Sequence, residues 1–127
     1  MTVLCGDLAF LHDLNSLLLA RNSQQPLTLV LINNNGGGIF SFLPIAKFDD
    51  VFEPYFATPH QLSFAAAADL FGLKYAAPKT PQEFSEAYRQ AVSSGNTTLI
   101  EVVTDRQENY RLHRGLQQQI KAALTAE

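Results

Sequence analysis

The stretch LTLVLINNNGGG, residues 27–38, joins an apolar run directly to three asparagines and three glycines. Residues 27–32 are apolar with almost no alternation, which is typical of a strand buried on both faces of a parallel sheet. Asparagine and glycine pack poorly, but they present polar atoms and bare backbone. The residues after the strand therefore form either an elaborate turn or a place that holds a charged ligand.

Apolar runs and helical periodicities alternate along the rest of the chain. Strands are expected at residues 2–5, 27–32, 74–77 and 97–103. Helices are expected at residues 9–21, 59–72, 81–95 and 107–125, with one or two helical turns at 39–44. This order predicts an α/β fold, a parallel sheet with helices on both faces.

Two threonine–proline pairs indicate where helices begin. Thr58 and Thr80 are each followed by proline and, three residues on, by Gln61 and Glu83. This spacing is typical of a capping residue and its reciprocal partner. Residues 45–57 show no such regularity, and their four aromatic residues predict a surface loop with anchors.

Length and composition set outer limits on the class of protein. The 127 residues suit a single domain, 1–127, and a net charge of −3 without a basic patch argues against nucleic-acid binding. Cys5 is the only cysteine, so we expect a buried thiol, no intrachain disulfide and a reducing, cytoplasmic location. No run approaches the roughly 20 apolar residues of a membrane span, and no secretion signal is evident.

The start of the chain is informative because it lies inside a predicted strand. The run TVLC follows Met1 directly. Domains seldom begin within a buried strand. We therefore expect the chain to be a piece of a longer protein, lacking the N-terminal elements of its fold.

Oxygen-bearing side chains follow the first two predicted strands. Asp7 closes the first strand, and Asn34 closes the second, 27 residues later. In a strand–helix–strand unit these two ends can lie side by side, where ligands of parallel sheets bind. Carboxylate, amide and backbone carbonyl oxygens suit Mg²⁺, and the glycines at 36–38 allow the backbone to come close to a ligand.

A purely structural interpretation stays open for this pattern. Asp7 alone would be explained as a helix cap, and Asn33 to Asn35 as a turn. The joint pattern is more specific, because it combines Gly-Asp, a fixed interval, and an asparagine followed two residues on by glycine.

Other polar residues receive structural interpretations. Glu101 lies inside an apolar strand and must have a buried partner. Asp105 and Arg106 are expected to form a local ion pair, and His60 to meet solvent or an internal hydrogen bond. Solvated positions on helix faces are expected for the remaining candidates, His12, Asp13, Arg111, His113 and Arg114.

The Gly6-Asp7 and Asn33-Asn34 pairs together resemble the diphosphate-binding motif of thiamine-diphosphate-dependent enzymes. Leu8 stands where that motif usually has glycine, as in the branch of the family that serves menaquinone and phylloquinone synthesis. Four segments resemble the same branch: GDLAFLHDLNSLLLAR, NNNGGGIFSFLP, FATPH and TDRQENYRLHRGL. The likeness runs almost from end to end.

The resemblance implies roles for individual residues. The Asp7 carboxylate, the Asn34 side chain and the Gly36 carbonyl would bind Mg²⁺ or Mn²⁺. Thiamine diphosphate would contact Gly6, Asp7, Leu8, Asn34, Gly36, Gly37, Ile39 and Phe40. Ile39, Phe40 and Leu43 would also wall the substrate pocket, although they can equally be core residues of a short helix.

The resemblance also implies a reaction and partners. Enzymes of this branch decarboxylate 2-oxoglutarate on thiamine diphosphate and add the resulting carbanion to isochorismate. Their activating glutamate lies on a pyrimidine-binding domain, usually of a partner subunit in a homodimer or homotetramer. No catalytic residue is therefore expected here, and this C-terminal module would be inactive alone, in the cytoplasm or in a plastid.

Two alternatives remain from the sequence. One is the corresponding module of another thiamine-diphosphate-dependent lyase, such as one of the acetolactate-synthase type, although Leu8 and TDRQEN argue against it. A stand-alone binding module that has lost catalysis is the other alternative.

Overall fold

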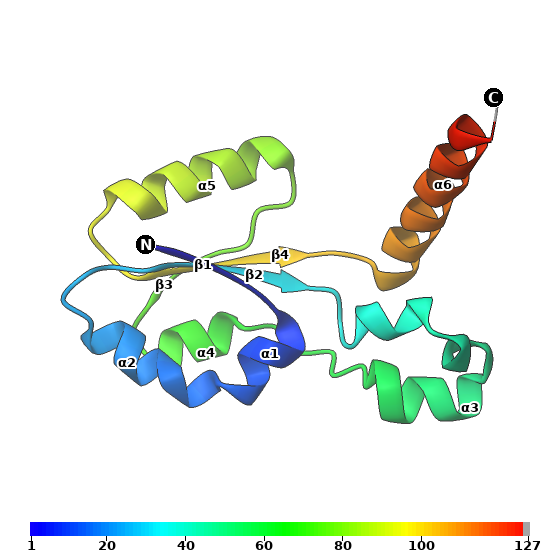
Figure 1. Cartoon of the computed structure of the whole chain (residues 1–127). Coiled ribbons are helices and arrows are strands. Elements are labelled where there is room, and N and C mark those ends of the chain that lie inside the picture. The colour runs from blue at the N-terminus through cyan, green and yellow to red at the C-terminus, as the bar shows by residue number, and fades with distance from the viewer. Residues whose placement is uncertain (126–127) are drawn as a thin grey trace. The chain divides into compact units, whose positions relative to one another are not determined.

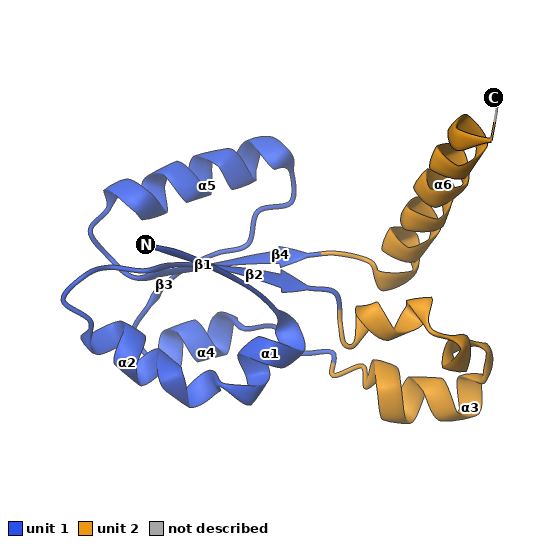
Figure 2. Cartoon of the chain, in the orientation of Figure 1, with its two compact units in different colours: residues 1–34, 61–103 blue, residues 35–60, 104–127 orange. Residues whose placement is uncertain are grey.

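A computed structural model describes residues 1–125, and these separate into two compact units (Figure 2). The first unit comprises Met1–Asn34 and Gln61–Val103, and the second comprises Asn35–His60 and the chain from Thr104. The expectation of a single domain over residues 1–127 stays a prediction.

The first unit is built on a four-stranded parallel sheet (Figure 1). Its strands are β1 (Thr2–Gly6), β2 (Thr28–Asn33), β3 (Lys74–Ala76) and β4 (Thr98–Val103). They lie in the order β1-β2-β4-β3, so β2 and β4 form the centre. The predicted parallel sheet is confirmed, with all four strands within two residues of their expected positions.

The two central strands hold fully buried side chains, and the apolar run at residues 27–32 forms most of one of them, β2. Leu31 of β2 lies opposite Glu101 of β4, and Leu99 and Ile100 beside it are fully buried. Side chains on both faces of these strands are withdrawn from water. This explains why the run lacks alternation, since neither face of a central parallel strand meets solvent.

Helices cover both faces of this sheet. Helix α5 (Pro81–Ser93) lies on one face, whereas α1 (Asp7–His12), α2 (Leu17–Asn22) and α4 (Ala65–Leu70) lie on the other (Figure 1). The main core forms where the second group meets the sheet. Its buried members are Phe10, Leu17, Leu29, Leu31, Phe64, Ala68, Leu73 and Leu99.

The predicted helix over residues 9–21 is wrong in its continuity. The structure has α1, a 3-10 turn η1 (Leu14–Ser16) and then α2, and α1 begins earlier, at Asp7. The interruption falls at Asp13, whose φ and ψ are −114° and 28°. The Ser16 hydroxyl donates to the Asp13 carbonyl over 2.7 Å, so a polar side chain competes with the helical backbone bonds.

The helix start predicted at Thr58 is also wrong. Thr58 has φ 45° and directly follows the π-helical segment η4 (Glu53–Ala57). Its N–H donates to the carbonyl of Glu53, the first residue of that segment. It therefore terminates one helical segment, and the next helix, α4, begins only at Ala65. The equivalent prediction at Thr80 is confirmed, because its hydroxyl accepts from the Glu83 N–H ahead of α5.

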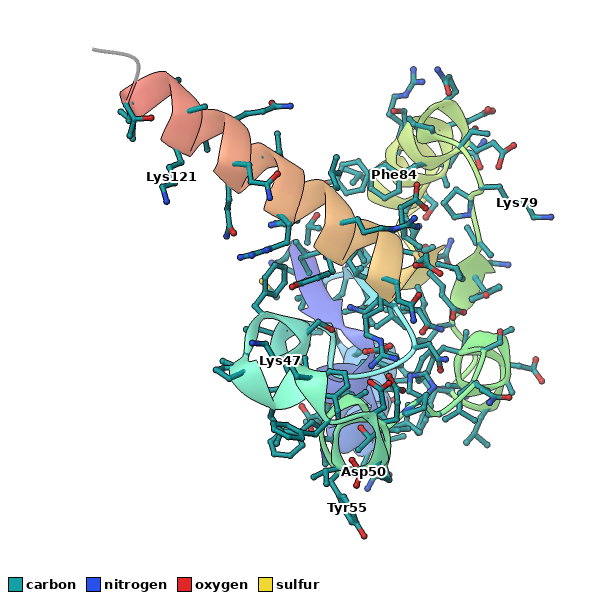
Figure 3. All side chains as sticks on the ribbon, turned by 90° about the vertical axis from the view of Figure 1, so that its right-hand side faces the viewer. Lys47, Asp50, Tyr55, Lys79, Phe84 and Lys121 are labelled. Carbon is teal, nitrogen blue, oxygen red and sulfur yellow. The ribbon has the colours of Figure 1, made fainter. Side chains whose placement is uncertain are left out.

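The second unit is more helical than expected. In place of a loop over residues 45–57 it has short helical segments η3 (Pro44–Lys47), α3 (Asp49–Phe52) and η4. Phe52 is buried as an anchor, whereas Tyr55 projects outward (Figure 3). Before these segments, η2 (Gly38–Phe42) supplies the predicted helical turn.

The final helix, α6 (Arg106–Leu124), confirms the prediction for residues 107–125. Asp105 caps it, since the Glu108 N–H donates to the Asp105 carboxylate over 2.7 Å. None of its residues is buried.

Within residues 1–125, no helix combines the length and the apolarity that crossing a bilayer requires.

Candidate functional site

The carboxyl ends of β1 and β2 deliver two oxygen-bearing side chains to one edge of the sheet. Strand β1 runs beside β2 with Gly6 opposite Ile32. Asp7 directly follows β1, and Asn34 directly follows β2. The predicted juxtaposition of the two strand ends is therefore present in the first unit.

Asp7 is buried, with 3% of its surface exposed. It is the first residue of α1, and the N-cap position belongs to Gly6. One carboxylate oxygen, Oδ1, accepts the Leu8 N–H over 2.8 Å. A carboxylate has about four lone-pair positions and is a type of ligand that Mg²⁺ accepts. The interpretation of Asp7 as a simple N-cap is wrong.

The Asn34 side chain has a buried oxygen whose hydrogen-bonding capacity is unused. Its Oδ1 atom is withdrawn from solvent and has no hydrogen-bond partner within the described part of the chain. Leaving a buried acceptor unsatisfied costs about 1–3 kcal/mol. A bound cation would satisfy this oxygen, so Asn34 fits the chemistry of a metal ligand.

The glycines after Asn34 permit a close backbone approach in the second unit. Gly36 has φ +126°, and a Cβ atom there would lie 2.1 Å from the Ala57 carbonyl oxygen. A Cβ atom on Gly37 would lie 2.4 Å from the Phe56 carbonyl oxygen. The Gly36 carbonyl accepts the Gly38 N–H over 2.8 Å. Neither position tolerates a side chain.

The three residues predicted to wall a pocket differ in exposure. Ile39 is 75% exposed and Leu43 is 48% exposed, so neither is a core residue of the described chain. The Phe40 ring packs edge-on against the Phe56 ring, with the centroids 5.9 Å apart. Exposed apolar side chains at Ile39 and Leu43 are suited to cover a ligand, and that role stays a prediction.

A buried hydrogen-bond network lies next to Asn34 in the sequence, at Asn33, and only part of it was predicted from the sequence. Glu101 is 1% exposed, and its carboxylate accepts the Asn33 amide and the Tyr75 hydroxyl, each over 2.6 Å, and the Phe64 N–H over 3.0 Å. The Asn33 amide also donates to the Leu62 carbonyl over 3.0 Å. The expected structural partner of Glu101 is thus confirmed, but nothing local in the sequence identifies the three donors.

The same network changes the pKa of the Tyr75 hydroxyl. Burial, followed by the hydrogen bond to Glu101, raises the pKa of the Tyr75 hydroxyl above its ordinary value, and a hydrogen bond with Ser63 acts in the opposite direction. The neutral phenol that donates to Glu101 is therefore favoured.

Burial also raises the pKa of the Cys5 thiol, although this side chain is only partly buried.

The expected ion pair between Asp105 and Arg106 is wrong. The Arg106 guanidinium instead donates from Nη2 to both oxygens of the Glu53 carboxylate, each over 2.9 Å. Asp105 is occupied as the cap of α6. A charged pair so distant in sequence leaves no local signal.

The remaining polar candidates have the expected structural surroundings. His12 and Asp13 are exposed. The backbone N–H of His60 donates to the Asn35 side chain over 3.1 Å, and the interpretation of the His60 imidazole stays a prediction. Arg111, His113 and Arg114 are exposed positions of α6. Within residues 1–125, no three His, Cys, Asp or Glu side chains gather as metal ligands. A cation held by the described residues would thus need amide or carbonyl oxygens as well.

The fold and the motif define a class of protein. Residues 1–102 match the family model described as thiamine pyrophosphate enzyme, C-terminal TPP binding domain. The chain belongs to this family.

Relatives within this class share one name. The chain is 56% identical over 117 residues to 2-succinyl-5-enolpyruvyl-6-hydroxy-3-cyclohexene-1-carboxylate synthase of Chlorobium phaeovibrioides, covering 92% of this chain and 20% of that protein. It is also 56% identical over 116 residues to the synthase of the same name from Rubrobacter xylanophilus, covering 91% and 20%. The chain thus spans about a fifth of the length of these relatives.

Solved structures support the fold. Benzoylformate decarboxylase from Polynucleobacter necessarius aligns with a TM-score of 0.71 at 23% identity, over 83% of this chain and 19% of that one. A thiamine diphosphate-dependent 4-hydroxybenzoylformate decarboxylase from Rhodococcus jostii aligns with a TM-score of 0.70 at 24% identity, over 82% and 19%. At these identities the likeness concerns the fold alone.

Proposed function

We propose that this chain is the C-terminal, diphosphate-binding module of a 2-succinyl-5-enolpyruvyl-6-hydroxy-3-cyclohexene-1-carboxylate synthase. The observation that carries the proposal is 56% identity to a synthase of that name over 92% of the chain. The aligned fifth of that relative is too short to supply a whole enzyme. The module would therefore act only together with the remainder of such a protein.

The proposed reaction divides the work between cofactor and protein. Thiamine diphosphate, when bound, supplies the thiazolium carbon on which 2-oxoglutarate would be decarboxylated, and the four-carbon group that remains would then be added to isochorismate. The module itself would hold the diphosphate, align the cofactor and keep water away. An activating glutamate would come from the pyrimidine-binding domain of a partner subunit, in a homodimer or homotetramer in the cytoplasm or a plastid.

The proposed metal ligands are the Asp7 carboxylate, the Asn34 amide oxygen and the Gly36 carbonyl, around Mg²⁺ or Mn²⁺. Three observations support them: the buried carboxylate after β1, the unsatisfied Asn34 oxygen, and the crowding that excludes a side chain at Gly36. Hard oxygen donors of these kinds suit Mg²⁺, which usually retains water and substrate phosphates.

The cofactor contacts proposed here are those of the diphosphate motif and the turn after it. They comprise Gly6, Asp7, Leu8, Asn34, Gly36, Gly37, Ile39 and Phe40. Ile39, Phe40 and Leu43 would form the apolar wall of the substrate pocket. The exposure of Ile39 and Leu43 supports this role.

A chimera tests the proposed function. The chain is joined to the upstream four fifths of the Chlorobium phaeovibrioides relative, replacing the region to which it aligns. We expect turnover of 2-oxoglutarate with isochorismate and none of pyruvate alone. A folded chimera that consumes pyruvate alone would instead favour a lyase of the acetolactate-synthase type, and one that binds the cofactor without any turnover would favour a non-catalytic module.

Calorimetry on the same chimera tests the metal ligands. We expect Asp7→Ala to weaken binding of thiamine diphosphate with Mg²⁺ by more than about tenfold, because a charged ligand is lost. The matched control is Asp13→Ala, which removes an exposed aspartate nearby in sequence and should leave affinity unchanged. Equal affinities for Asp7→Ala and the parent chimera would refute the proposed metal site.

A further inference from the structure

Glu101 is a buried carboxylate that is not among the proposed metal ligands or cofactor contacts. It lies in the central strand β4 with 1% of its surface exposed, and Leu31 of β2 lies opposite it. Strands β2 and β4 lie side by side and run parallel, so their carboxyl ends reach the same edge of the sheet (Figure 1). A buried carboxylate is costly unless it is hydrogen-bonded, so Glu101 is stable at this position only because neighbouring groups donate to it.

The three groups that donate to Glu101 come from separate segments of the first unit. The Asn33 amide belongs to β2, the Tyr75 hydroxyl to β3, and the Phe64 N–H to the residue before α4. Oε1 accepts from Asn33, whereas Oε2 accepts from the other two donors. The carboxylate therefore connects both strands that flank β4 with the segment that leads into α4.

The partners of the Asn33 amide nitrogen fix its orientation. Nδ2 donates to Glu101 over 2.6 Å and to the Leu62 carbonyl over 3.0 Å. Because an ionised carboxylate and a carbonyl only accept hydrogen bonds, the amide oxygen cannot take the place of the nitrogen. Glu101 and the Leu62 carbonyl therefore hold the side chain of the last residue of β2 in one orientation.

Asn34 directly follows this fixed residue but lies outside the strand pairing. The last register pair between β2 and β4 joins Asn33 to Val103. The Asn34 Oδ1 atom, which is the proposed metal ligand, is buried and has no hydrogen-bond partner within residues 1–125. Its position is therefore set through the backbone by the residue before it, rather than by a hydrogen bond of its own.

We infer that Glu101 is a positioning residue for Asn34, an inference that rests on the proposed function and its metal site. Glu101 acts through the Asn33 amide, which it holds in the one orientation that also bonds the Leu62 carbonyl. This fixes the peptide group that leads to Asn34 and so the place from which the Asn34 oxygen meets a cation. Groups behind the ligands of a metal commonly orient those ligands in this way.

The test measures binding of thiamine diphosphate with Mg²⁺ by calorimetry in the chimera with the Chlorobium phaeovibrioides relative, which contains the whole chain. Asn33→Ala removes the amide that donates to Glu101. The carboxylate keeps its Tyr75 and Phe64 donors, so the fold should persist, as circular dichroism would verify. We expect affinity to fall at least about tenfold, the loss that is typical when a group behind a metal ligand is removed.

Glu101→Gln tests the same link from its other end. The new side chain has one oxygen, which can face Asn33 or Tyr75 but not both. Even when it faces Asn33, the bond is weaker because it is no longer charge-assisted. We expect affinity to fall at least about threefold. Unchanged affinity in either folded variant would overturn the positioning role.

A double-mutant cycle separates positioning from a general structural effect. Asn34→Ala removes the proposed ligand oxygen, so it should weaken binding at least about tenfold by itself. Adding Asn33→Ala should weaken binding by less than about twofold further, because the side chain that Asn33 positions is already absent. An equal further loss in both backgrounds would show that Asn33 acts independently of Asn34 and would overturn the inference.

Thr80→Ala is the matched control for instability, because it removes a helix cap in the same unit but outside the network. Affinity should stay within about twofold of the parent chimera in this variant. Failure of the parent to bind the cofactor would refute the proposed function and this inference together. If Asn34→Ala weakens binding but Asn33→Ala does not, the proposed metal site stands and only the positioning role fails.

Discussion

Asn33 and Asn34 are neighbours of the same type whose side chains meet opposite surroundings. The Asn33 amide donates to Glu101 and to the Leu62 carbonyl, whereas the Asn34 Oδ1 atom is buried without a partner in the described chain. A satisfied amide holds the end of β2, and an unsatisfied one is suited to a ligand. Asn33 is the last residue of β2, whereas Asn34 lies just beyond the strand.

The Glu101 network should contribute measurably to stability. In Glu101→Gln the side chain keeps one acceptor oxygen and gains two donors, so at least one of the Asn33 and Tyr75 donors loses its partner. We expect a loss of about 1–3 kcal/mol in the free energy of unfolding, measured with urea. Glu86→Gln, on the exposed face of α5, should change it by less than about 0.5 kcal/mol. Similar losses in both variants would contradict the structural role.

Stability should fall at high pH because of Tyr75. Its pKa in the folded chain is raised above the ordinary value of 10.0, so its contribution is fully present below that value and is lost as the pH rises through the folded pKa. We expect the urea midpoint to decrease above the ordinary tyrosine pKa of 10.0 more steeply in the parent chain than in Tyr75→Phe. If the urea midpoints of the two chains changed with pH in the same way, Tyr75 would not contribute to the pH dependence of stability.

Gly36 should be intolerant of any side chain. Gly36→Ala combines a positive φ with a Cβ atom 2.1 Å from the Ala57 carbonyl oxygen, so we expect a loss well above 1 kcal/mol, or no folding. Gly115→Ala is the matched control, since a Cβ atom there meets nothing within 4 Å inside α6. That change should stabilise the chain by about 0.5–1 kcal/mol in thermal unfolding. A stable Gly36→Ala variant would refute the crowding.

At the scale of elements, similar sequence signals lead to different structures. Thr58 and Thr80 both precede proline, yet only Thr80 caps a helix. Thr80 has φ −131°, the extended backbone that a cap requires, whereas Thr58 has φ 45°. The N–H of Thr58 is taken by the preceding segment at Glu53, so this threonine ends a helix.

This difference is testable by matched substitutions. Thr80→Ala should lower the free energy of unfolding by about 1 kcal/mol, because the N–H of Glu83 loses its acceptor. Thr58→Ala should change it by less than about 0.5 kcal/mol, since this exposed side chain caps no helix. A larger effect at Thr58 would restore the capping interpretation of that segment.

For the whole molecule, the two units differ in how they bury apolar surface. The first unit encloses the main core around the sheet, with fully buried side chains in β2 and β4. In the second, α6 has no buried residue, and four large apolar side chains stay exposed at four-residue spacing. These are Leu112, Leu116, Ile120 and Leu124.

Amide hydrogen exchange should reveal this difference. We expect the backbone amides of β2 and β4 to exchange slowly and those of α6 to exchange much faster, since little packing opposes local opening of that helix. Mass spectrometry of peptides from the exchanged chain provides the measurement. Protection of α6 comparable to that of β4 would show that another surface covers its apolar side chains.

How much of the structure can be predicted from the sequence depends on how far apart the interacting residues lie along the chain. The positions of Asp7 and Asn34 after two strands could be predicted because each follows an apolar run with a recognisable local pattern. Glu101 was expected to have a partner, but Asn33 is separated from it by 68 positions and Tyr75 by 26. The helical segments within 45–57 were missed because their short turns show no extended periodicity.

The sequence by itself determined the parallel α/β architecture and the positions of Asp7 and Asn34 after two neighbouring strands, because burial on two faces and turn chemistry depend on adjacent residues. Only the tertiary structure decided that Arg106 pairs with Glu53, that Thr58 ends a helix, and that the Asn34 oxygen is buried without a partner. These outcomes depend on how distant segments pack against each other. Hydrogen bonds and close contacts between such segments have no counterpart in local composition.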